Sequence, residues 1–133
     1  MNKSIPFYYT FLLILIGMLT VFSNQTFAQY NNPYVRIAKI VIDSTQLENY
    51  RAALREHARA AVGNEPGVIT MYAVYDKEQP THVTVFEMYA DIPAYQSHIR
   101  TTHFLKYKSA VKDMVKSLVL TDVVPIALET KLK

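Results

Sequence analysis

The sequence predicts one small α+β domain, and three observations support this fold class. Three runs of β-branched and aromatic residues, Tyr34–Ile42, Val68–Tyr75 and His82–Tyr89, have the composition and partial alternation of strands. Two longer stretches carry apolar residues every three or four positions, as amphipathic helices do. With a last strand near the end, the order is β-α-β-β-α-β. This is the ferredoxin-like order, in which helices cover one face of a four-stranded sheet.

The first 28 residues are predicted to be an export signal. Lys3 gives a positive start, an uncharged apolar run of 16 residues extends from Phe7 to Phe22, and Thr26-Phe27-Ala28 resembles a signal-peptidase site. The run is shorter than the roughly 20 residues of a membrane-spanning helix. We therefore expect cleavage after Ala28 and a single exported domain at residues 29–133, periplasmic or extracellular. An uncleaved amino-terminal anchor is the alternative.

Composition excludes several classes of protein and site. The chain has no cysteine, so an exported domain must be stable without disulfides, through packing or self-association. The formal net charge is only +3, and no clustered basic face suggests nucleic acid as a partner. The sequence contains no glycine-rich phosphate-binding loop and no arrangement of serine, histidine and aspartate typical of a catalytic triad.

The first half of the domain reads as a strand, a helix and a hairpin. After the strand at Tyr34–Ile42, the segment from Asp43 to Gln46 offers a capping-box variant. The helix that follows carries an apolar stripe made of Leu47, Tyr50, Leu54, Ala58 and Ala61. Gly63 is expected to end this helix. The polar residues 76–81 then join the next two strands into an antiparallel hairpin with a long loop.

The second half reads as two helices and a strand. Asp91 is placed to cap a short helix at Ile92–Arg100, with Pro93 in its first turn. A further helix is predicted from Thr102 to Lys116, and a last strand from Leu118 to Val124. Residues 126–133 form a tail that either adds an edge strand or crosses to a partner.

Apolar residues on both faces of the predicted sheet indicate a homodimer. Val83 and Val85 alternate with Phe86 and Met88 along one strand, so each face carries apolar side chains. Helices cover only one face in this fold. We expect a second copy to cover the other.

Several short motifs resemble the antibiotic biosynthesis monooxygenase family, over about residues 34–125. They are Glu65-Pro66-Gly67-Val68, the segment Glu87-Met88-Tyr89-Ala90-Asp91-Ile92-Pro93-Ala94, His98, and Thr102-His103-Phe104. The resemblance implies a dimeric α+β barrel. It also implies one of several chemistries: cofactor-free oxygenation of quinols or phenols, haem degradation, or isomerisation of small carbonyl compounds.

The pattern is most similar to the quinol-monooxygenase-like members. Haem-degrading members resemble one another in a pocket tryptophan and a first-strand asparagine. This chain has no tryptophan, and no asparagine between Tyr34 and Ile42. The aromatic-polyketide oxygenases also use such a pair. Haem is therefore not expected, and the cofactor prediction is none, with molecular oxygen as co-substrate.

The candidate catalytic residues are His98, Glu87 and His103. Cofactor-free oxygenation needs a base that deprotonates a phenol or quinol, and histidine titrates in the required range. We expect His98 to be the base or a substrate-binding group, with Glu87 as its orienting partner. The alternative for each residue is structural: a capping histidine, or a carboxylate in a buried ion pair.

Aromatic side chains are the candidates for a wall around a flat substrate. The predicted substrate-binding residues are Tyr72, Tyr89, Phe104 and Tyr107. Packing in the core or in a dimer interface is the alternative for each. His82 is an odd number of positions before Glu87 in the same predicted strand, so its side chain is expected on the opposite face. No metal site is predicted.

Three functions remain open at this point. The first is an exported monooxygenase acting on a quinol or phenolic aromatic molecule. The second is a non-oxidative isomerase of a small hydroxy-carbonyl compound, using the same histidine and carboxylate. The third is a non-catalytic binder of a hydrophobic ligand. Fold alone does not choose among them.

Overall fold

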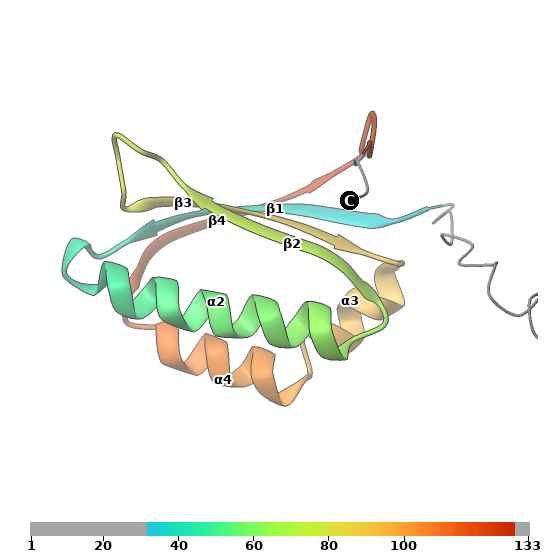
Figure 1. Cartoon of the computed structure of the whole chain (residues 1–133), viewed down its shortest axis with the longest axis horizontal. Coiled ribbons are helices and arrows are strands. Elements are labelled where there is room, and N and C mark those ends of the chain that lie inside the picture. Colours follow the sequence, from blue (N-terminus) through green and yellow to red (C-terminus); the bar gives the residue numbers. More distant parts are fainter. Residues whose placement is uncertain (1–31, 130–133) are drawn as a thin grey trace, which may run out of the picture.

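The computed structural model describes residues 32–129, which form a four-stranded antiparallel sheet with helices on one face (Figure 1). The strands are β1 (Tyr34–Ile42), β2 (Val68–Tyr75), β3 (His82–Tyr89) and β4 (Val115–Val123). Their order across the sheet is β2-β3-β1-β4. This is the predicted ferredoxin-like α+β fold.

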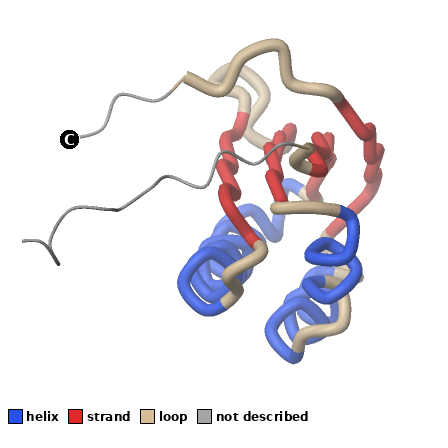
Figure 2. Tube along the Cα trace, turned by 90° about the vertical axis from the view of Figure 1, so that its right-hand side faces the viewer, coloured by secondary structure: helices blue, strands red, loops and turns tan. Residues whose placement is uncertain are grey.

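Helices connect the strands on a single side of the sheet, as the view along it shows (Figure 2). They are the 3-10 turn η2 (Ser44–Gln46), α2 (Leu47–Asn64), α3 (Ile92–His98) and α4 (Thr102–Val111). The predicted leader at residues 1–28 lies outside the described residues. Within residues 32–129, no helix is both long and apolar enough to cross a membrane.

The helix ends differ from the sequence prediction. Gly63 does not end α2, which continues to Asn64 and stops before Pro66, because a residue preceding proline avoids helical geometry. The α3 helix ends at His98 rather than at Arg100.

The largest difference is at residues 112–116, predicted as the end of a helix. The α4 helix ends at Val111, and β4 begins at Val115, where Ile42 of β1 is its partner. Pairing with β1 therefore overrides the helical spacing of the apolar residues. Beyond Val123, the described residues 124–129 form no further strand.

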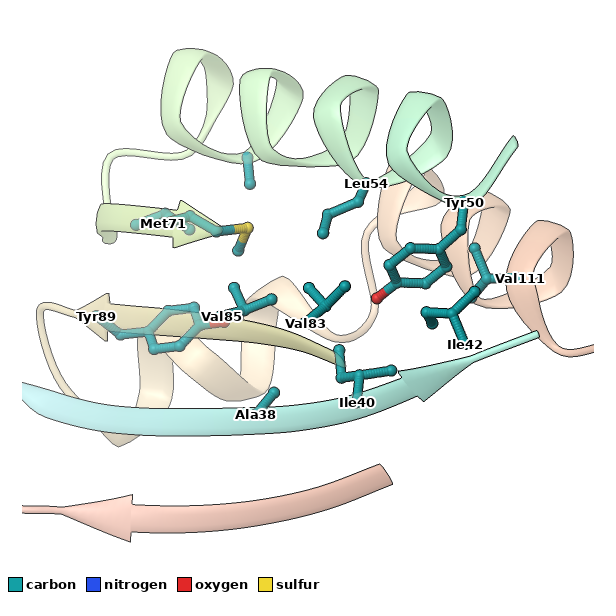
Figure 3. Close-up of a cluster of buried hydrophobic side chains, with 12 residues drawn as sticks. Ala38, Ile40, Ile42, Tyr50, Leu54, Met71, Val83, Val85, Tyr89 and Val111 are labelled. Carbon is teal, nitrogen blue, oxygen red and sulfur yellow. The ribbon is translucent and has the colours of Figure 1, made fainter. Parts of the chain in front are cut away.

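Strand register assigns each side chain to a face. Tyr89, Glu87, Val85 and Val83 face the helices from β3, and Arg36, Ala38 and Ile40 lie opposite them on β1. Figure 3 shows Tyr50 and Leu54 of α2 directed at these strands. Apart from the charged Glu87 and Arg36, these side chains belong to the hydrophobic core. The other face of the sheet carries Tyr72, Val74, Phe86 and Met88.

Candidate functional site

A cavity of about 330 Å³ lies between the helix-covered face of the sheet and the helices. Its wall is mostly apolar, with contributions from all four strands and from α2, α3 and α4. The polar and aromatic side chains around it are Arg36, Tyr50, His57, Glu87, Tyr89, Tyr95, Phe104, Tyr107, Lys108 and Lys112. The volume lies within the range of small-molecule sites.

Glu87 places a carboxylate in this cavity. It faces the helices from β3, and its neighbour across the strand pair is Arg36 of β1. The hydroxyl of Tyr89 donates a hydrogen bond of 2.9 Å to Glu87 Oε2. Burial raises the pKa of Glu87 above its ordinary value, although Tyr89, His98 and Arg36 oppose this shift. The carboxylate is thus a stronger base than one in water.

Arg36 is held rigidly at the cavity wall by polar partners. Its Nε donates to Asp122 Oδ1 at 2.8 Å, and Nη1 donates to the Tyr95 hydroxyl at 2.5 Å. Nη2 donates to the hydroxyl of Tyr34. The guanidinium also lies 4.5 Å from the centre of the Tyr95 ring. A positive charge is thereby fixed near Glu87.

His57 forms the opposite wall and was not predicted as a site residue. Its ring stacks on Tyr107 with centroids 4.6 Å apart and an interplanar angle of 9°. Burial, and then the nearby His98 and His103, lower the pKa of His57 to about 4, so it is neutral at pH 7. The sequence does indicate that His57 is buried, because it follows Tyr50 and Leu54 at helical spacing on the buried stripe of α2.

His98 and His103 converge, but on a different carboxylate from the one expected. His98 Nδ1 lies 2.8 Å and His103 Nε2 lies 2.6 Å from Glu65 Oε1. The expected pairing of His98 with Glu87 is therefore wrong. His98 is the last residue of α3, and there its imidazole lies within hydrogen-bonding distance of Glu65, which directly follows α2. Neither histidine lines the cavity. His57 and Tyr89 do line it, and both of their rings pack against His98.

The predicted aromatic wall is found in part. Tyr89, Phe104 and Tyr107 line the cavity as expected. Tyr72 does not: it pairs with Phe86 on the opposite face of the sheet and is 64% exposed. A one-residue difference in strand alternation decides the face. His82 is exposed, and its register places it on that same opposite face.

Comparisons with known proteins agree with the fold. The profile of one family, described as antibiotic biosynthesis monooxygenase, matches residues 33–110. A solved structure from Bacteroides thetaiotaomicron, which carries the same family name, is 47% identical, with a TM-score of 0.74. The match covers 78% of this chain and 99% of that one. None of the curated proteins matches.

More distant structures share the fold. A protein from Lactobacillus acidophilus, assigned as a monooxygenase, is 26% identical, with a TM-score of 0.69 over 71% of this chain and 45% of that one. A protein from Pseudomonas aeruginosa is 19% identical, with a TM-score of 0.68 over 75% of this chain and all of that one. The second likeness bears on fold alone.

Proposed function

Because this chain belongs to the antibiotic biosynthesis monooxygenase family, we propose that it is a cofactor-independent monooxygenase acting on a quinol or phenolic aromatic molecule. One observation carries the proposal. Glu87 holds a carboxylate of raised pKa in an apolar, aromatic-lined cavity. A base in such a place suits the removal of a proton from a weakly acidic hydroxyl.

The proposed reaction starts with proton transfer from a substrate hydroxyl to Glu87. The resulting anion passes an electron to O₂, and recombination forms a carbon–oxygen bond. For a quinol, one O₂ is consumed: one oxygen atom enters the ring, the other leaves as water, and the product is a hydroxyquinone. The substrate supplies all the electrons, so no external reductant is needed.

Neighbouring residues have defined roles in this scheme. The Tyr89 hydroxyl holds one carboxylate oxygen of Glu87 in place. The fixed guanidinium of Arg36 stabilises the developing phenolate, because it needs no reorganisation during the reaction. The stacked His57 and Tyr107 rings provide a flat wall for an aromatic substrate. His98 becomes a positioning residue behind Tyr89 rather than the base.

The test is oxygen uptake by the purified protein with a panel of quinols and polyphenols, with catalase present and protein-free blanks for autoxidation. Glu87→Gln should reduce uptake by about 100-fold or more. The control is Glu56→Gln, which removes a carboxylate on the exposed side of α2, outside the cavity. Its uptake should equal that of the unmodified protein.

Other outcomes would contradict the proposal and point to the alternatives. Uptake no faster than the blank, with tight binding of the same compounds, would favour a non-catalytic binder. Anaerobic conversion of a hydroxy-carbonyl compound that Glu87→Gln abolishes would favour an isomerase. Uptake that is equal in both variants would remove Glu87 from the mechanism.

Export is proposed together with this activity. It rests on the sequence of residues 1–28, with its charged start and apolar run. Cell fractionation and amino-terminal sequencing of the purified protein test it. A mature amino terminus at Gln29, outside the cytoplasm, is the expected result, and an intact Met1 would contradict cleavage.

A further inference from the structure

One carboxylate and two imidazoles meet outside the cavity, where three helices come together. Glu65 follows the last residue of α2, His98 ends α3, and His103 is the second residue of α4. Figure 1 shows these helix ends side by side near the start of β2. The ligand-type atoms of the three side chains all lie within 4.8 Å of one another. None of the three lines the cavity.

The geometry is close to that of a metal site. Both imidazoles contact the same oxygen, Glu65 Oε1, at 2.8 and 2.6 Å. Around a tetrahedral ion with bonds near 2.1 Å, adjacent ligand atoms are about 3.4 Å apart. Each nitrogen–oxygen pair therefore needs to separate by about 0.6 to 0.8 Å, which a rotation of the Glu65 side chain supplies.

Burial gives this cluster both rigidity and access. The side chain of His98 is 2% exposed, that of Glu65 14% and that of His103 24%. The deepest ligand is thus fixed by packing, whereas the outermost leaves an entry path from solvent. Two imidazoles and one carboxylate suit zinc and neighbouring divalent ions, with water in the remaining positions.

We propose that Glu65, His98 and His103 bind one divalent transition-metal ion, with a preference for Zn²⁺ or Co²⁺. Each imidazole binds through the nitrogen that contacts Glu65, and its ring hydrogen moves to the other nitrogen. The ion replaces the two hydrogen bonds and ties the end of α2 to α3 and α4. This site is separate from the cavity and does not depend on the proposed oxygenase activity.

The experiment uses chelator-treated protein purified without a histidine tag. Calorimetric titration with Zn²⁺ should give one ion per chain and a higher midpoint of thermal unfolding. Co²⁺ should give visible d–d absorption. Glu65→Gln and His103→Ala should each weaken binding by at least about 10-fold. The matched control is His82→Ala, an exposed histidine of β3, which should bind like the unmodified protein.

Two results would overturn the proposal. One is the absence of saturable Zn²⁺ binding by the unmodified protein. The other is equal affinity in Glu65→Gln and His82→Ala. Glu65→Gln retains an acceptor oxygen for the imidazoles, so it should keep the fold, and far-ultraviolet circular dichroism checks this. If His103→Ala fails to fold, Glu65→Gln alone decides.

Discussion

Glu87 lies among apolar side chains, and this position costs the folded protein stability. Its pKa is raised in the folded state by burial, so ionising it is harder there than in the unfolded chain. Ionisation of Glu87 therefore leaves stability unchanged below the unfolded pKa, lowers it as the pH rises from the unfolded to the folded pKa, and costs a constant amount above that. Glu87→Gln should therefore be more stable than the unmodified protein at pH 8, and the two should be similar near pH 4.

Urea unfolding of both proteins at the two pH values measures this difference. Glu56→Gln is the comparison, because Lys106 lowers the pKa of Glu56 and the sign of any effect is reversed. That effect should be small, since the Glu56 pair is exposed. A gain from Glu87→Gln that is the same at pH 4 and pH 8 would contradict a buried, ionised carboxylate.

Two glycines offer a matched test of packing. A Cβ on Gly67 would lie 2.6 Å from Cβ of Ala94, whereas a Cβ on Gly63 would have nothing within 4 Å. Gly67→Ala should destabilise the fold by about 1–3 kcal/mol, because β2 and α3 must move apart. Gly63→Ala should stabilise it by about 0.5 kcal/mol, because alanine favours the helix. Unfolding free energies measure both, and equal effects would contradict the close approach of Gly67.

At the level of elements, the strands of the first half were predictable and the last helix–strand junction was not. Tyr34–Ile42, Val68–Tyr75 and His82–Tyr89 match β1, β2 and β3, because alternation and β-branching are local signals. The conformation of residues 115–117 depends on pairing with β1, which lies far away in the sequence. No local pattern carries that information.

The candidate site divides in the same way. Glu87, Tyr89, Phe104 and Tyr107 were found because strand alternation and motif spacing predict their faces. The contact of Glu65 with His98 joins residues 33 positions apart, with β2, β3 and their connecting turns between them. The partner of a buried histidine is therefore known only from the tertiary structure.

The short helix α3 depends on its cap. The Asp91 side chain accepts a 2.8 Å hydrogen bond from the backbone N–H of Ala94, and α3 has only 7 residues to stabilise it. Asp91→Ala should lower the free energy of unfolding by about 1 kcal/mol, whereas Asp91→Asn should retain most of it. Chemical denaturation of the two variants tests the cap. Equal losses would show that charge, rather than hydrogen bonding, stabilises this turn.

The whole molecule has one sheet face that the described residues leave largely uncovered. Tyr72, Val74 and Val119 point away from the helices and are 64%, 63% and 54% exposed. Exposing apolar surface of this kind to water is unfavourable in free energy, and packing against the same face of a second copy would bury it. We therefore expect a homodimer formed face to face.

Light scattering after size exclusion should give twice the mass of the chain. Val74→Lys should shift the protein towards the monomer, because the interface would have to bury an unpaired charge. Leu105→Lys is the matched control: Leu105 is 56% exposed but belongs to α4, on the helical side of the molecule. A monomer at tens of micromolar for the unmodified protein would contradict the dimer. Equal dissociation by both variants would place the interface elsewhere, because a charge on the helical side cannot disturb contacts between the outer sheet faces.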